Sequence, residues 1–402
     1  MRIGLIAALA VSGIVVAPAQ AAGTVLYGGH PDAIAGSYIV VLKKDAGPAS
    51  ARTEVVRGAK ITFSYEHALS GYAVRTDAAG ARRIAGDPRV AYIAQDLRVE
   101  IADVARPAPA PVGAQALGVQ PDPPSWGLDR LDQRSRPLDA RYYYANTGSN
   151  VRAYIVGTGI RYTHQEFNGA AVPGYDAVGG VTPPGSDCNG HGTHMAGTVG
   201  GQTVGVAKDV KLVSVRVLNC QGSGTYSAIL AGINWITQDT QASGRRSVVM
   251  MSLGGTFNQA LNDAITASTN ANVHYSLPAG SSNGDACTTS PGSATAGTTV
   301  AVSDANDTRA SFSNYGPCID LFAPGVNIYS AWGTSDTAYS TISGVTATAH
   351  ATGVAALWRH KFPGDSAYAT ATALTANATP GIVANVPANT ANLLLHSGMI
   401  PV

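Results

Sequence analysis

The chain has 402 residues, of which 45% are hydrophobic and only 13% are charged, and it contains 46 glycines. This composition predicts a loop-rich globular protein of two or three compact units and excludes a disordered chain. The formal net charge of +1 gives no basis for binding nucleic acid or a membrane surface through a global field, so neither is an expected partner.

The N-terminal residues predict export. Met1-Arg2 is a short basic start, Ile3–Val16 is apolar, and Ala19-Gln20-Ala21 is a small-x-small cleavage site, which together are typical of a secretory signal peptide over residues 1–21. A membrane anchor is the alternative, but the apolar run is too short for one. We therefore expect a secreted, extracellular monomer that has no membrane contact after signal removal.

Residues 38–101 predict a small α+β domain. Runs beginning at Tyr38 ("YIVVLK"), Leu69 ("LSGYAVR") and Val90 ("VAYIAQD") have the composition of strands, which we expect to be antiparallel. The segment 76–88 ("TDAAGARRIAGDP") predicts a helix that ends near Gly86. Residues 102–118 are rich in Ala and Pro, which indicates a linker. It connects the α+β domain to a third unit, residues 119–402, when the signal peptide is counted as the first.

Strands and helices alternate in the third unit. The pattern predicts strands over 151–157, 211–218, 247–253 and 273–280, and helices over 225–238, 258–268 and 349–360. Such alternation favours a parallel sheet with helices on both faces. In "AYIVGTGIRYTHQEF" (153–167) the strand ends in a Gly-rich turn, at the carboxyl edge where open α/β sheets place their sites.

The chain has four cysteines, Cys188, Cys220, Cys287 and Cys318. An even number in an oxidising compartment predicts two disulfides, and the spacing leaves all three pairings open. Metal ligation by these cysteines is disfavoured, because CxxC spacing and nearby paired histidines are missing.

Several long stretches resemble the subtilases, and in particular their proteinase K-like branch: "DCNGHGTHMAGTVGG" (187–201), "MSLGG" (251–255) and "SFSNYGPCIDLFAPGVNIYSAW" (311–332). Residues 38–101 resemble the inhibitory propeptide of that family. The resemblance implies a subtilisin-like three-layer α/β fold with a central, mostly parallel sheet, preceded by a ferredoxin-like α+β propeptide. It also implies a serine endopeptidase made as a prepro-protein, an Asp-His-Ser triad with an oxyanion asparagine, and Cys188–Cys220 and Cys287–Cys318 disulfides.

The catalytic motifs depart from that pattern. His191 matches the general base, but Gly157 stands at the aspartate position and Ser281 at the oxyanion asparagine position. The nucleophile segment "SGVTATAH" (343–350) is one residue shorter than the family pattern, so that Thr346 or Val345 occupies the serine position.

These replacements predict a pseudo-protease. A hydroxyl attacks only when an imidazole takes its proton, and a buried carboxylate must orient that imidazole. In subtilisin, where the value was measured, loss of the serine alone lowers turnover about 2 × 10⁶-fold. Two alternatives remain: an endopeptidase that uses Thr346 with His191, although the β-branch of threonine restricts its hydroxyl, or an enzyme of another reaction class that reuses the pocket.

The parts that bind peptide are better retained. The resemblance places Ser252, Leu253, Gly254 and Gly255 on an edge strand that pairs with an extended peptide, and Ala279 and Gly280 in the primary pocket. The expected partners are therefore the chain's own propeptide, which would stay attached or be removed by another protease, and extended peptide or protein segments. No cofactor is expected to be required, and Asp320 matches one ligand of a structural calcium ion.

Overall fold

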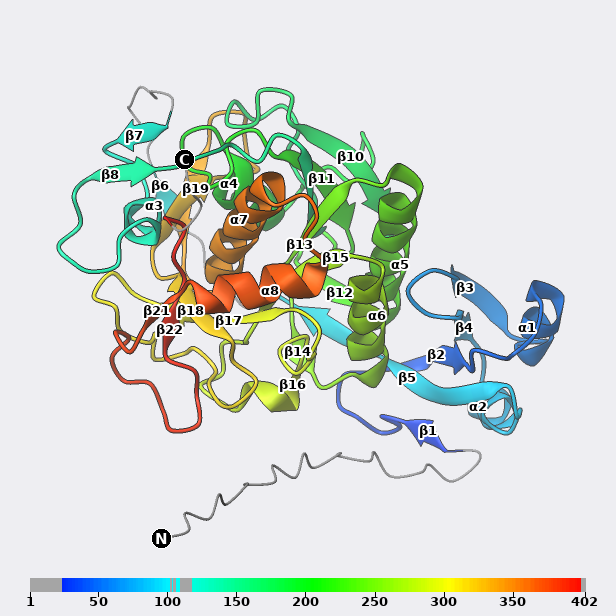
Figure 1. The fold of residues 1–402 in the computed structure, drawn as a ribbon. Coiled ribbons are helices and arrows are strands. Elements are labelled where there is room, and N and C mark those ends of the chain that lie inside the picture. Colours follow the sequence, from blue (N-terminus) through cyan, green and yellow to red (C-terminus); the bar gives the residue numbers. More distant parts are fainter. Residues whose placement is uncertain (1–23, 102, 104–105, 109–117, 399–402) are drawn as a thin grey trace, which may run out of the picture.

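The computed structural model describes residues 24–101, 103, 106–108 and 118–398 (Figure 1). The expected signal peptide lies outside the described residues, as does most of the expected linker. Within the described ranges the chain forms a small N-terminal unit and a large unit that contains the remaining helices and strands. No helix in these ranges is long and apolar enough to cross a membrane.

The N-terminal unit is a sheet with the strand order β1-β5-β2-β4-β3. Its neighbours are antiparallel, except that β1 runs parallel to β5. Helix α2 starts where Asp77 accepts a hydrogen bond from the backbone N–H of Gly80, as capping chemistry requires. The expected strands and helix are present, while β1, β3 and α1 were not predicted. The bounds are β1 (Val25–Leu26), β2 (Ala33–Leu42), α1 (Ala49–Val55), β3 (Lys60–Tyr65), β4 (Gly71–Arg75), α2 (Ala78–Ala85) and β5 (Val90–Glu100).

The two faces of this small sheet pack against different partners. Side chains alternate along β2, so Tyr38 and Val40 face a core shared with α1 and α2. Ile39 and Val41 point the other way and belong to a core that includes residues of the large unit. Figure 1 shows the small unit lying beside α5 and α6. The N-terminal unit is therefore anchored to the large unit by a continuous apolar core.

The large unit is organised around a sheet with the strand order β10-β11-β9-β13-β15-β17-β18-β22-β21. All neighbours are parallel apart from the pair β21 and β22. The predicted mostly parallel sheet is confirmed. The bounds are β9 (Val151–Gly157), β10 (Ala171–Asp176), β11 (Lys211–Arg216), β13 (Arg246–Met251), β15 (Val273–Pro278), β17 (Thr298–Ser303), β18 (Leu321–Pro324), β21 (Thr379–Pro380) and β22 (Leu393–Leu394).

Helices cover both faces of the large sheet, which gives the predicted three layers (Figure 1). In β9, Ala153 and Ile155 pack with α4 and α7, while Tyr154 and Val156 pack with α5 and α6. Both faces of β9 are buried, which explains why its sequence is a continuous apolar run. The helices are α3 (Trp126–Leu131), α4 (His191–Gly200), α5 (Tyr226–Ser243), α6 (Gln259–Asn270), η1 (Ala286–Thr288), α7 (Thr346–Lys361) and α8 (Ala367–Ala376).

Short strands complete the large unit, and two of them pair with segments that follow the N-terminal unit. Strand β12 pairs antiparallel with the end of β5, and β20 pairs antiparallel with β6. The chain therefore leaves the N-terminal unit through a series of strand pairings with the large unit. The short strands are β6 (Arg106–Ala108), β7 (Val119–Pro121), β8 (Arg141–Tyr143), β12 (Ser223–Thr225), β14 (Gly255–Thr256), β16 (Thr289–Ser290), β19 (Ile328–Ala331) and β20 (Tyr339–Ile342).

Candidate active site

The expected site residues lie where central strands end and two helices begin. Gly157 is the last residue of β9, Ser252 follows β13, and Ala279 follows β15. His191 is the first residue of α4, and Thr346 is the first residue of α7. Because neighbouring strands are parallel, their carboxyl ends meet at one edge of the sheet. The fold thus brings these positions together as the sequence predicts.

His191 is held at the start of α4 by a capped turn. Asp187 accepts hydrogen bonds from the backbone N–H groups of Asn189, Gly190 and Thr193 and from the hydroxyls of Thr158 and Thr193. Its carboxylate is therefore occupied by five donors at the positive end of a helix. This arrangement fixes the backbone of His191, and the hydrogen bonds of the Asp187 carboxylate go to this turn rather than to the His191 ring.

The Nδ1 atom of His191 is buried and has no hydrogen-bond partner among the residues that the structure describes. Gly157, which stands at the aspartate position, has no side chain to reach it. A Cβ atom on Gly157 would lie 2.4 Å from the hydroxyl of Ser252. That hydroxyl donates to the carbonyl of Val156 at 2.7 Å. Ser252 thus occupies the space that an aspartate at position 157 would need, and nothing in the described chain orients the imidazole through Nδ1.

The other ring nitrogen of His191 faces a carboxylate that the sequence did not reveal. Nε2 lies 2.9 Å from Oδ2 of Asp103, and the side chains of His191 and Asp103 are only 2% and 5% exposed. A carboxylate accepts hydrogen bonds, so Nε2 must carry a proton to pair with it. A general base must instead present a free Nε2 to its nucleophile. In the intact chain, His191 is therefore held with its proton on the nitrogen that a base would use.

Neither candidate for the nucleophile position offers His191 a free hydroxyl. Thr346 is fully buried, and its hydroxyl donates to the carbonyl of Gly325 at 3.1 Å. Val345 is the residue immediately before α7 and lines the cavity beside the site, but its side chain has no polar atom. This geometry favours Val345 over Thr346 as the residue at the serine position.

The other buried histidines near the site are structural. Burial lowers the pKa of His194 to about 3, and His191 beside it adds to the effect. Its Nε2 lies within hydrogen-bond distance of the carbonyls of Ile328 and Ser340. Burial likewise lowers the pKa of His350 to about 4. Both imidazoles are neutral at pH 7, and they do not substitute for the triad.

The loop at the expected oxyanion position is built by another asparagine. Asn314 is fully buried; its Oδ1 accepts hydrogen bonds from the backbone N–H groups of Ser282 and Gly284, and its Nδ2 donates to the carbonyl of Ala279. Gly280 has φ +99°, and a Cβ on it would lie 2.4 Å from Nδ2 of Asn314. Ser281 is exposed at the mouth of the cavity. The loop is thus rigidly held, with a hydroxyl in place of the family's amide.

The predicted peptide-binding residues line a groove that the chain itself occupies. Gly254 forms an antiparallel bridge with Glu100, and the N–H of Ile101 donates to the carbonyl of Gly222. A cavity of about 280 Å³ adjoins this segment. Its walls include Ser252, Leu253, Gly254, Gly255, Gly280, Ser281 and Val345, while Ala279 is buried beneath it and lines a smaller neighbouring hollow.

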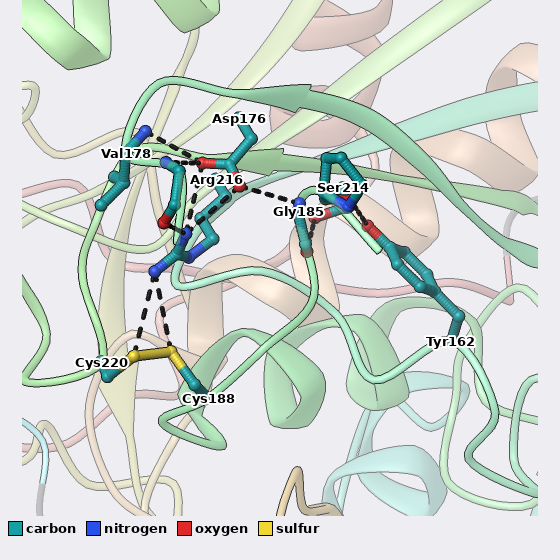
Figure 2. Close-up of polar contacts among 10 residues, drawn as sticks. Tyr162, Asp176, Val178, Gly185, Cys188, Ser214, Arg216 and Cys220 are labelled. Carbon is teal, nitrogen blue, oxygen red and sulfur yellow. Dashed lines mark hydrogen bonds and ion pairs between the residues drawn. A yellow bond between two sulfur atoms is a disulfide. The ribbon is translucent and has the colours of Figure 1, made fainter. Parts of the chain in front are cut away.

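Both disulfides implied by the resemblance are confirmed. Cys188 pairs with Cys220, and Cys287 pairs with Cys318. Figure 2 shows the first of them beside Arg216, the last residue of β11. The Arg216 guanidinium pairs with the carboxylate of Asp176 at 3.2 Å and approaches the Cys188 sulfur at 3.6 Å. This buried cluster ties the end of β11 to the loop that precedes His191.

Carboxylates that could hold a cation lie away from the site. Asp320 accepts a hydrogen bond from the N–H of Thr299, and burial raises the pKa of its carboxyl. At α3, one oxygen each of Asp129, Asp132 and Gln133 is buried without a partner. Burial raises the pKa of Asp132 to about 7, and Asp129 adds to the rise. Calcium prefers such oxygens. The described residues hold no group of three or more His, Cys, Asp or Glu placed to bind a metal.

The comparisons with known proteins agree with this architecture. The family model described as "Subtilase family" matches residues 148–395, and the one described as "Peptidase inhibitor I9" matches residues 37–102. The chain is 45% identical to "Extracellular serine proteinase" of Thermus sp. (strain Rt41A), over 91% of this chain and 90% of that protein. It is 36% identical to "Alkaline serine protease ver112" of Corniculantispora psalliotae, over 99% of this chain and 100% of that protein.

A solved structure is similar as well. The crystal structure of a cold adapted subtilisin-like serine proteinase matches with 46% identity and a TM-score of 0.64, over 68% of this chain and 97% of that one.

Proposed function

The chain belongs to the subtilase family and carries a peptidase inhibitor I9 domain, and from this premise we propose that it is a secreted subtilase homologue that binds extended peptide or protein segments without cutting them. The relatives named above are described as an extracellular proteinase and an alkaline protease. Export through the N-terminal signal sequence is part of the proposal.

The main support for the proposal is the hydrogen bonding of the two ring nitrogens of His191. Its Nδ1 has no partner, and its Nε2 is paired with the Asp103 carboxylate. Without a carboxylate at Nδ1, the imidazolium that forms during acyl transfer is not stabilised and the ring is not held in the required tautomer. Loss of that carboxylate alone lowers turnover about 3 × 10⁴-fold in subtilisin, from which this value is taken.

The geometry of the neighbouring positions supports the same reading. The Thr346 hydroxyl is committed to a backbone carbonyl, and Ser281 reaches less far than the asparagine it replaces. Removing an oxyanion amide costs about 10² to 10³ in turnover on its own. These losses are not additive, because the residues of a triad act as a unit. A Thr346–His191 endopeptidase therefore has no support from the contacts of Thr346.

The groove supports the binding part of the proposal. Antiparallel pairing with Ser223–Thr225 on one side and Gly254 on the other is the geometry of strand addition, in which main-chain hydrogen bonds hold the peptide. Such binding needs no cofactor. A calcium ion at Asp320, if bound, would stabilise the start of β18 and would take no part in peptide binding.

The test uses the purified full chain in three assays: cleavage of labelled casein, intact mass over time, and reaction with a serine-reactive phosphonate. We expect casein to stay intact, the N-terminal unit to stay attached, and no phosphonate adduct. The His191→Ala variant is the matched control and should behave identically. Casein cleavage that is lost in His191→Ala, or a phosphonate adduct at Thr346, would overturn the proposal.

A further inference from the structure

We propose that the groove selects peptides by an acidic side chain placed opposite His191, and that Asp103 of the chain's own linker is one such ligand. The inference rests on the proposed function, because the acid must remain uncut in the groove. It adds the chemical class of the ligand: an extended segment with a carboxylate at this one position.

The linker is held in register on both sides of Asp103. Before it, Arg98–Glu100 pairs with β12, and Glu100 also bridges to Gly254. After it, Arg106–Ala108 pairs with β20, and the Ser340 hydroxyl donates to the carbonyl of Arg106 at 2.7 Å. Asp103 lies between these pairings and lines both the cavity beside Ser252 and a second cavity of about 310 Å³ beside Ser343. Backbone pairing therefore fixes which residue of a bound segment faces His191.

The contact itself favours a carboxylate over other side chains. Both partners are nearly excluded from water, at 2% and 5% exposure, so each needs the other to satisfy its polar atoms. An apolar side chain at position 103 would leave Nε2 of His191 buried and unpaired, in addition to Nδ1. An amide could accept a hydrogen bond but would forgo the charge, and charge-assisted hydrogen bonds are about twice as strong as neutral ones.

Two glycines of the site make room for this acid. A carboxylate at position 157 would already pair with the imidazole and would repel a second carboxylate, because like charges that share a site disfavour each other. Gly157 removes that competitor. Gly344 leaves the space that the ligand needs: a Cβ on it would lie 2.1 Å from Oδ1 of Asp103. The glycines at positions 157 and 344 thus leave room for an acidic side chain beside His191.

Hydrogen–deuterium exchange on the full chain tests the inference, with the amides of residues 99–101, 103, 106 and 108 as the readout. The variants are Asp103→Ala, Asp103→Asn, Asp103→Glu, His191→Ala and the double variant Asp103→Ala/His191→Ala. Glu100→Ala is the matched control, because it removes a nearby carboxylate at the end of β5 that faces Ser223 rather than His191.

Asp103→Ala should speed exchange of this segment about 10- to 100-fold, the loss expected for one hydrogen bond to a charged group. Asp103→Asn should lie between Asp103→Ala and the unaltered chain, and Asp103→Glu should keep most of the protection. The double variant should be no worse than either single one, because both remove the same contact. Glu100→Ala should change exchange less than 3-fold, on the order expected for an exposed group.

Two exchange results would contradict the inference, and they have different consequences for the proposed function. If the unaltered linker is protected but Asp103→Ala exchanges at the same rate, acid selection is wrong and the groove still binds peptide. If the unaltered linker exchanges like an unstructured chain, the groove holds no segment and the proposed function fails as well. Should His191→Ala not fold, the comparison of Asp103→Ala with Asp103→Glu decides the matter by itself.

Discussion

A buried carboxylate, Asp96 of β5, adds polar contacts to the apolar interface between the N-terminal unit and the large unit. Asp96 is only 1% exposed. It accepts hydrogen bonds from the backbone N–H of Ser227 at 3.1 Å, from the Ser227 hydroxyl at 2.6 Å and from the Ser37 hydroxyl at 3.2 Å. Ser227 lies in the first turn of α5, so Asp96 acts as a cap supplied by another unit.

Replacing Asp96 by alanine removes the acceptor of three donors, of which the Ser227 hydroxyl keeps Oγ1 of Thr225 within hydrogen-bond distance at 2.8 Å. One unsatisfied buried group costs about 1–3 kcal/mol. Water from the adjoining cavity of about 310 Å³, which Asp96 lines, can reach some of these donors. Burial raises the pKa of Asp96, which shows that its charge is itself costly in the folded state. We therefore expect a net loss of about 2 kcal/mol at the interface, in the middle of the range for single substitutions.

Asparagine at position 96 keeps the shape and one acceptor but removes the charge, so Asp96→Asn should cost less than Asp96→Ala. The direction in which this stability difference changes with pH follows from the raised pKa of Asp96. A carboxyl whose folded pKa is raised contributes stability below its unfolded pKa, and that contribution is lost as pH rises through the folded pKa. The advantage of the unaltered chain over Asp96→Asn should therefore shrink as pH rises above about 4, a value close to the unfolded pKa.

Hydrogen–deuterium exchange of the first turn of α5 and of β5 measures this loss. At pH 7, Asp96→Ala should exchange about 30-fold faster, which corresponds to about 2 kcal/mol. Ser223→Ala is a suitable control, because it removes a hydroxyl from β12 without touching Asp96. Equal exchange in Asp96→Ala and the unaltered chain would refute the capping argument, and so would an Asp96→Asn variant as damaged as Asp96→Ala at pH 7.

Three further predictions concern substitutions at buried or partly buried positions. Gly157→Asp should leave casein cleavage at background. It should also destabilise the chain by about 1 kcal/mol, because the Ser252 hydroxyl must give up its hydrogen bond to the carbonyl of Val156. Casein cleavage by Gly157→Asp that depends on His191 would contradict this prediction. Burial lowers the pKa of Lys208 to about 7. The stability of the unaltered chain relative to Lys208→Met should therefore rise between about pH 7 and 10, measured as the difference between their urea midpoints. A difference that does not change with pH would contradict a buried lysine that is neutral in the folded chain. If calcium binds at Asp320, it should raise the melting temperature of the unaltered chain more than that of Asp320→Asn, and equal shifts would contradict binding at Asp320.

Much of the fold follows from local pattern in the sequence. The apolar run of β9 and the helical periodicity of α5 predicted the sheet and its layers, because burial on both faces leaves a direct trace in composition. Strand β3 was missed: five of its six residues are partly or fully exposed, so its sequence carries little apolar pattern. Helix α1 was missed for a related reason, since Val55 is its only fully buried residue.

The candidate site was predictable only where residues match a pattern along the chain. His191 and Gly157 were found in this way, and the structure brings them to the same sheet edge. Asp103 was not, because it lies 88 residues before His191 in a segment that composition describes only as a linker. Its role depends on how the N-terminal unit docks and on where β12 and β20 hold the chain. The direction of the Thr346 hydroxyl is likewise a property of packing rather than of spacing.

The protonation of His191 is the central claim, and nitrogen-15 NMR of the full chain with labelled histidine measures it directly. Comparison with His191→Gln identifies the signals of this ring. The account predicts a proton on Nε2 at pH 7, and loss of its hydrogen-bonded shift in Asp103→Ala. A ring with its proton on Nδ1 and a free Nε2 is the form that a general base requires, and finding it in the unaltered chain would contradict the account.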